Sequence, residues 1–346
     1  MDERKCKILQ AVIDEYIKTG EPVGSNSLIK QLNMPVSSAT VRNDMVLLEK
    51  LGYLEQPHTS AGRVPTHLGY RYYINNLMTP KQLTTKEKTL IDTLLLQNDI
   101  TADSVVENAV NVLADLTKMT VITSSKIPIF SMITRVEVIP AGRRLYALLI
   151  ITSTGTIKNK ICRLEFDLTY EQLNFFEKFI NDTLTGVNID SLNPAMLQNI
   201  AVALGSYMIS LSPLLHEVYK LTEEINKTTI NFTGEQNLLS QKSFHANEVV
   251  DLLNHKNELE GLLSTALDGI SIVFGNENDS FAISNSSMIM SPYSIGSQKG
   301  GSFGLIGPAR IDYAKVIPYV EYFSKSVTKI LSGIVLKNDD DNDCKS

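Results

Sequence analysis

Four side chains between residues 37 and 73 have the chemistry to read the edges of DNA bases. Asn can pair with adenine through two hydrogen bonds, Arg can do the same with guanine, and the methyl groups of Ala and Thr can contact the thymine methyl. The candidates for base reading are Ala39, Thr40, Arg42 and Asn43. An ordinary solvated helix face is the alternative interpretation, and these residue types alone do not decide between the two.

A helix over this segment would place the four side chains on its outer side. Ser37 and Ser38 are good N-cap residues, and Gly52 supplies a C-terminal stop. At 100° per residue, the candidates lie opposite or beside an apolar stripe that must pack inward. That stripe consists of Val41, Met45 and Leu48.

A second set of side chains suits phosphate or minor-groove contacts. After the helix, residues 53–57 read as a strand, HTSAGR as a polar loop and Val64 as the return strand. Hydroxyl, imidazole and guanidinium groups are typical of contacts to phosphates and to the minor groove. The candidates for DNA backbone or hairpin contacts are Ser37, Ser38, Lys50, His58, Thr59, Ser60, Arg63 and Arg71. For Arg71, a surface salt bridge is an equal alternative.

The elements around these residues predict a winged helix-turn-helix. Amphipathic helices are expected over residues 4–18 and 25–32, with a short turn before the helix that starts near Ser37. The hairpin that follows is the wing. Some winged helices serve only as protein-protein modules, but the exposed Asn, Arg and Thr and the Arg of the loop favour double-stranded DNA.

Length and composition indicate a cytoplasmic protein of two or three domains. The chain has 346 residues, of which 43% are hydrophobic. It starts without an apolar signal segment, and its longest apolar run, residues 145–151, is only strand length, so we expect no membrane span. Cys6, Cys162 and Cys344 are far apart and lack zinc spacing, which fits a reducing compartment.

Charge is distributed unevenly along the chain. Residues 1–80 carry nine Lys and Arg against eight Asp and Glu, whereas residues 81–346 carry 23 against 30. The N-terminal part therefore has a net charge of +1, which does not by itself indicate nucleic acid. The Asp-rich residues 337–346 are expected to form an acidic, disordered tail.

The rest of the chain predicts an α+β domain interrupted by an inserted block. Helices are expected at residues 66–80, 86–97, 102–118, 170–184 and 313–336. Three strands that form an antiparallel meander are expected at residues 131–139, 144–152 and 156–165. A mainly helical block follows the meander, and strands resume at residues 269–274, 281–290 and 302–306. The block therefore interrupts a sheet.

No set of residues predicts catalysis, a metal or a cofactor. The five histidines lack the spacing of metal ligands, and the glycines near residue 300 match no phosphate-binding loop. Residues 276–279, NEND, lie between two apolar strands, where a hairpin turn is a simpler interpretation than a metal cluster. We therefore expect a protein that is not an enzyme.

Several blocks give the chain a specific resemblance to a known family. SSATVRNDM with LEKLGYLEQPHTSAGRVPTHLGYRYYI resembles the N-terminal signature of the heat-inducible transcription repressors of the HrcA family. VFGNENDS at residues 273–280 and GSFGLIGPARIDYAKVIPYVEYFS at residues 301–324 are similar to its C-terminal blocks. The match is weakest over residues 184–263. At His67, many members of the family carry a charged or more polar residue.

The resemblance implies a domain order and a function. The order is a winged-helix domain with a linker helix (1–80), a GAF-like domain in two parts (81–184 and 266–336), an inserted dimerisation domain (185–265) and the tail (337–346). The function implied is a homodimeric repressor that binds the CIRCE inverted repeat upstream of chaperone operons. The resemblance also implies that its activity depends on the chaperonin and is lost on heat stress. A small-ligand-sensing winged-helix regulator that uses the GAF-like domain is the alternative hypothesis.

Overall fold

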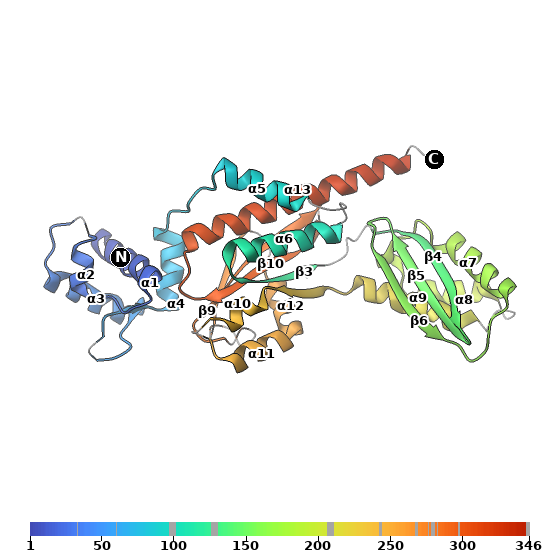
Figure 1. Cartoon of the computed structure of the whole chain (residues 1–346), viewed down its shortest axis with the longest axis horizontal. Coiled ribbons are helices and arrows are strands. Elements are labelled where there is room, and N and C mark those ends of the chain that lie inside the picture. The colour runs from blue at the N-terminus through green and yellow to red at the C-terminus, as the bar shows by residue number, and fades with distance from the viewer. Residues whose placement is uncertain are drawn as a thin grey trace.

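The computed structural model shows three groups of elements that follow one another along the longest axis of the molecule (Figure 1). The structure describes residues 1–346 apart from residues 33, 60, 97–101, 126–130, 206–210, 242–243, 267–268, 276, 278–280, 282, 297 and 344–346. Helices and a short hairpin form one end, a five-stranded sheet lies in the middle, and a three-stranded sheet lies at the other end. The protein therefore has a mixed α+β fold, as the sequence predicts.

Residues 3–77 form the first group, the N-terminal module. Its elements are α1 (Glu3–Thr19), α2 (Ser25–Ile29), α3 (Ser38–Lys50), β1 (Leu54–Glu55), β2 (Val64–Pro65), α4 (His67–Tyr72) and the π-helical turn η1 (Tyr73–Leu77). Asp2 caps α1, and Gly20 ends it in a left-handed conformation with φ of 71°. The predicted stripe of α3 is buried: Val41, Met45 and Leu48 are at most 4% exposed. The helix order and the antiparallel pairing of β1 with β2 agree with the sequence prediction.

The second group, the central unit, contains a fully antiparallel sheet with the order β7-β3-β10-β9-β8. The strands are β3 (Thr120–Ser125), β7 (Thr229–Thr233), β8 (Ser271–Phe274), β9 (Ser286–Ile295) and β10 (Gln298–Pro308). The helices are α5 (Thr85–Leu95), α6 (Ala102–Thr117), α10 (Glu235–Leu239), α11 (Ala246–Asn254), α12 (Lys256–Ser264) and α13 (Tyr313–Asp343).

Helices cover both faces of this sheet, so its central strands are apolar on both sides. Ile289 of β9 packs in the core that includes α6 and α13, whereas Met288 and Met290 pack in the core of α11 and α12. Because side chains alternate along a strand, this near-continuous burial marks a sheet between two layers. Figure 1 shows α6 and α13 on one side of the strands and α10–α12 on the other.

The third group, the inserted unit, lies between β3 and β7, which are neighbours in the sheet. It contains β4 (Ile133–Gly142), β5 (Leu145–Thr152), β6 (Ile157–Arg163), α7 (Tyr170–Leu184), η2 (Ile189–Ser191), α8 (Pro194–Leu204) and α9 (Ser212–Asn226). The antiparallel order β4-β5-β6 confirms the predicted meander. One hydrophobic core joins these strands to α7, α8 and α9.

The shared cores divide the chain differently from the boundaries predicted at residues 184 and 265. Helices α8 and α9 share a core with α7 and the meander, whereas α10–α12 pack against the five-stranded sheet. Periodicity predicts which face of an element is buried but not which partner buries it. Strand β3 was not predicted, β9 begins at Ser286 rather than at residue 281, and α13 continues to Asp343 through residues expected to be disordered.

Candidate nucleic-acid interface

Helix α3 presents the four predicted base-reading residues along its outer side. Ala39, Arg42 and Asn43 are exposed, and Thr40 is half-buried. Lys50 is also exposed, in the last turn of the helix. Neither Arg42 nor Lys50 forms an ion pair with any residue in the described part of the chain. The helix therefore offers two free cations and an amide to a ligand.

The two serines that open α3 make contacts within the module. The Ser37 hydroxyl accepts a hydrogen bond from the backbone N–H of Thr40 at 3.2 Å and lies 2.9 Å from the Thr40 hydroxyl. The Ser38 hydroxyl donates to the side-chain oxygen of Asn26 at 2.5 Å and lies 3.0 Å from the Ser25 hydroxyl. Ser38 thus fixes the start of α3 against α2.

A charged pair that sequence reasoning missed holds α3 against α1. Arg4 donates to both carboxylate oxygens of Asp44, at 2.7 and 3.2 Å. The hydrogen bond to Asp44 raises the pKa of the Arg4 guanidinium above its usual value. Asp44 is only 3% exposed, so its carboxylate needs this partner. Asp44 directly precedes Met45 of the apolar stripe, and this position in the sequence could have indicated a carboxylate that needs a charged partner.

Two of the three predicted contact residues at the tip of the hairpin are exposed to solvent. His58 and Thr59 are exposed near the tip, and Ser60 lies outside the described residues. The Gln56 amide donates to the carbonyls of Thr59 and Ala61, both at 3.0 Å, and so braces the loop from within.

Arg63 points into the module. Its guanidinium lies 2.9 Å from the Glu49 carboxylate on α3, and its side chain is only 15% exposed. Its backbone pairs with Val23 through two hydrogen bonds of 2.8 and 2.9 Å. A side chain at Gly62 would place its Cβ 2.4 Å from the Val23 carbonyl oxygen, so the glycine permits this close approach. Arg63 therefore ties the base of the hairpin to α3.

Arg71 on α4 faces the central unit. Its guanidinium lies 2.6 Å from the Glu277 carboxylate and 5.8 Å from the centre of the Phe274 ring. In the structure, Arg71 thus forms the salt bridge that was the alternative to a phosphate contact.

Aromatic packing joins the N-terminal module to the central unit at the same place. Tyr70 stacks on Phe274 with ring centres 5.9 Å apart and tilts against Tyr313 at 5.7 Å. Burial raises the pKa of Tyr70 well above its usual value. Gly69 lies against the backbone of Tyr53, where an added Cβ would come 2.2 Å from the carbonyl oxygen. The contacts of Tyr70 with Phe274 and Tyr313 are therefore the packing that joins the module to the central unit.

Two alternatives to nucleic-acid binding, a metal site and a membrane span, are not supported by the residues that the structure describes. No group of three His, Cys, Asp or Glu side chains there could hold a metal ion. No helix in the same part of the chain is long and apolar enough to span a membrane. The NEND turn falls largely on residues outside the described part.

Comparison with known proteins adds to this geometry. Residues 103–317 match the sequence family described as HrcA protein C terminal domain. The heat-inducible transcription repressor HrcA of Clostridium botulinum (strain Eklund 17B / Type B) is 36% identical over 342 residues, which cover 96% of this chain and 98% of that protein. The protein of the same name from Acetivibrio thermocellus is 32% identical over 356 residues and covers 98% of each chain.

A solved structure shares the fold. A hypothetical protein determined at 2.2 Å resolution superposes with a TM-score of 0.65 at 24% identity, over 96% of this chain and 99% of that one. Fold and interface together define a multidomain α+β protein with a helical N-terminal module that exposes a polar helix face. The chain belongs to the HrcA family, because the family match and the two relatives together cover nearly all of it. The resemblance seen in its sequence blocks is confirmed.

Proposed function

We propose that this protein is a DNA-binding transcriptional repressor of heat-shock chaperone operons that binds the CIRCE inverted repeat as a dimer. The observation that carries the proposal is the exposed row of Ala39, Arg42 and Asn43 on α3. The name of its relatives, heat-inducible transcription repressor, supports the same role. The protein acts in the cytoplasm and needs no catalytic group or cofactor for this work.

In this proposal, residues 1–80 act as a winged helix-turn-helix. Helix α3 enters the major groove with Arg42 and Asn43 at base edges and Ala39 and Thr40 near thymine methyls. Lys50, His58 and Thr59 contact the sugar-phosphate backbone, and the hairpin β1–β2 is the wing. Ser37, Ser38 and Arg63 support these contacts by positioning the helix and the hairpin.

The inserted unit supplies the dimer contact. One face of its sheet packs on α7 and α9, while the other is open and presents apolar side chains beside the polar Glu137 and Asn159: Ile139, Ile157 and Ile161 are 46%, 58% and 61% exposed. Ile139, Ala147 and Ile161 stand side by side across the three strands. A second copy of the chain is the occupant we propose for this face, because a self-complementary apolar patch suits a two-fold dimer on a palindromic site.

Substitution on this face tests the dimer. Ile157→Lys with Ile161→Lys is expected to give a monomer in sedimentation velocity, because four lysines would meet across the two-fold axis. Leu90→Lys on α5, another exposed apolar position at 50%, is the control and should leave the mass unchanged. A dimer that survives the double substitution would remove this face from the proposal.

In this proposal, the central unit is a GAF-like domain, and the inserted unit, residues 131–226, is the dimerisation domain.

The response to heat follows from the limited stability of the folded dimer. If the folded dimer depends on the chaperonin, heat that diverts the chaperonin lowers the amount of active repressor, and a change of about 1 to 2 kcal/mol alters functional abundance several-fold.

A gel-shift assay with a CIRCE duplex tests the proposed function. We expect the full chain to bind this duplex in preference to a scrambled duplex of the same composition. After a heat pulse, we expect chaperonin with ATP to restore binding. Equal affinity for both duplexes would rule out the operator, and recovery that ignores chaperonin would rule out the chaperonin link.

A further inference from the structure

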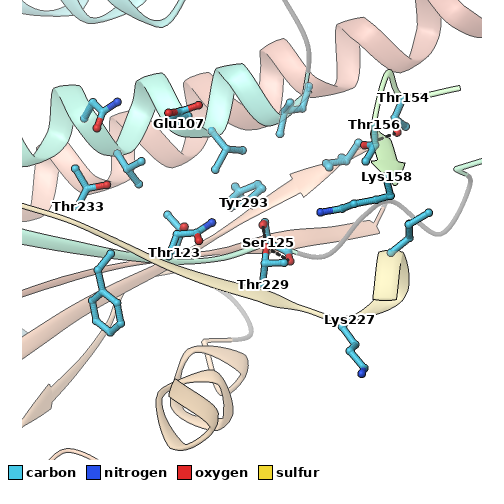
Figure 2. A pocket seen from close by; sticks show the side chains of 18 of the residues that line it. Glu107, Thr123, Ser125, Thr154, Thr156, Lys158, Lys227, Thr229, Thr233 and Tyr293 are labelled. Carbon is cyan, nitrogen blue, oxygen red and sulfur yellow. Dashed lines mark hydrogen bonds between the residues drawn. The ribbon is translucent and has the colours of Figure 1, made fainter. Parts of the chain in front are cut away.

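A cavity of about 550 Å³ lies where the central unit meets the inserted unit. Strands β3 and β7 and helix α6 form its walls on one side, and the β5–β6 hairpin closes it on the other (Figure 2). This volume falls in the range of about 300 to 1,000 Å³ that small-molecule sites occupy. The cavity is separate from the DNA-binding candidates, none of which lines it.

Hydroxyl groups line this cavity on both sides. Thr123 and Ser125 are two residues apart on β3 and so share one face, and Thr229 of β7 lies opposite Ser125 in the register. The Ser125 and Thr229 hydroxyls are 2.7 Å apart. On the hairpin, Thr154 and Thr156 add two more. Packing against α6 would favour apolar residues on this sheet face, so these hydroxyls, although several of them pair with one another, suit a polar occupant.

Lys158 of β6 is one of two lysines among the residues that line the cavity, with Lys227. It is half-buried, and no carboxylate in the described part of the chain lies within ion-pair distance of it. Lys160, two residues along the same strand, differs: its ammonium lies 3.0 Å from Glu224 and 3.2 Å from Glu217. The absence of a partner for Lys158 is therefore specific to the residue that faces the cavity.

Lys158 differs from the other charged residues that line the cavity. Figure 2 shows its ammonium directed toward Thr123 and Ser125, whereas Lys227 extends away from the other labelled side chains. Glu107 is exposed on α6, and Glu224 is engaged with Lys160. Although Glu107 and Glu224 also line the cavity, neither carboxylate pairs with Lys158 in the described part of the chain, so its ammonium is satisfied best by an anion that carries several acceptor oxygens.

We propose that this cavity binds a small phosphorylated polyol, such as a sugar phosphate. Lys158 would pair with the phosphate, and Thr123, Ser125 and Thr229 would share hydrogen bonds with the phosphate oxygens and the ligand hydroxyls. Buried Tyr293 and Val110 supply an apolar floor for the carbon skeleton. Because its walls come from both units, the ligand would also hold the inserted unit against the central sheet.

Isothermal titration calorimetry on the full chain, without DNA, tests this site independently of operator binding. The probes are ribose 5-phosphate, glucose 6-phosphate and glycerol 3-phosphate, each compared with its unphosphorylated counterpart and with inorganic phosphate. We expect at least one phosphorylated probe to bind at least tenfold more tightly than its counterpart and than inorganic phosphate. If none of the three binds, or if inorganic phosphate binds as tightly, the proposal is wrong.

Two variants assign the binding to this cavity. Lys158→Met removes the charge but keeps a long unbranched side chain and is expected to weaken the best probe at least tenfold, while Lys178→Met on the exposed side of α7 changes nothing. Thr123→Val replaces a hydroxyl by a methyl group of similar size and is expected to weaken binding several-fold, which keeps the test decisive if Lys158→Met does not fold. Wild-type affinity in folded Lys158→Met, or in Thr123→Val, would place the probe elsewhere.

Discussion

Arg71 and Glu277 are 206 residues apart in sequence, yet the guanidinium of one lies 2.6 Å from the carboxylate of the other. This pair crosses from α4 of the N-terminal module to the turn after β8 in the central unit, beside the stacked rings of Tyr70 and Phe274. The helix that follows the hairpin is therefore also a part of the contact between the two units.

The pair predicts how Arg71 contributes to DNA binding. Arg71→Gln is expected to cost less than about 1 kcal/mol of stability, because half-exposed ion pairs contribute little. If Arg71 stays on Glu277, the salt dependence of operator binding is unchanged. A direct phosphate contact would instead reduce the slope of log affinity against log salt by about one. Fluorescence anisotropy at several salt concentrations, with Glu277→Gln as the matched control, separates these outcomes.

Two buried tyrosines near this contact have different hydroxyl environments. The Tyr73 hydroxyl donates to Asp14 at 2.7 Å, whereas the buried Tyr70 hydroxyl has no hydrogen-bond partner among the described residues. Tyr73→Phe is therefore expected to lower the free energy of unfolding by about 1 kcal/mol, and Tyr70→Phe to leave it unchanged or to raise it. Urea denaturation of both variants measures this difference. A larger loss for Tyr70→Phe would contradict the assignment.

The Glu87 side chain predicts a pH dependence of stability. Hydrogen bonds from Tyr319 at 2.5 Å and from Thr84 at 2.7 and 2.8 Å lower its pKa from 4.5 to about 2. Because the folded-state pKa is below the unfolded value, the contribution of Glu87 is complete above about pH 5 and is lost as the pH falls toward 2. Glu87→Gln should therefore flatten the free energy of unfolding against pH within this window.

Thermal or urea unfolding between pH 2 and 7 checks the Glu87 prediction. Glu171→Gln, at an exposed position in the first turn of α7, provides the matched control. The same slope in Glu87→Gln as in the wild type would mean that the capping hydrogen bonds do not persist in solution.

Local signals predicted much of this fold, and partnerships between distant residues were not predicted. The caps and stripes of α1, α3 and α7 and the turns of the meander are local, and these elements were found. Strand β3 was missed because it directly follows a helix without a Gly or Pro break. Its place beside β7 depends on residues more than 100 positions away, which no local pattern encodes.

The candidate site shows the same limit. Exposure of Ala39, Arg42 and Asn43 follows from helix geometry, so the sequence predicts it correctly. The partners of Arg63 and Arg71 are acids on other elements, and only the folded chain shows that these cations are already paired. The free cations of the proposed interface are consequently fewer than the sequence suggests, with Arg42 and Lys50 on α3 as the main ones.

Operator affinity of Arg42→Ala and Asn43→Ala tests the central claim most directly. Anisotropy with a labelled CIRCE duplex is expected to show losses of about 1 to 3 kcal/mol for each variant, with relaxed preference over mutated operators, because each residue is proposed to contact a base edge. Lys178→Ala on the distant inserted unit should bind as the wild type does. Unchanged affinity and sequence preference for both α3 variants, with circular dichroism showing an intact fold, would contradict the claim that this helix face reads the operator.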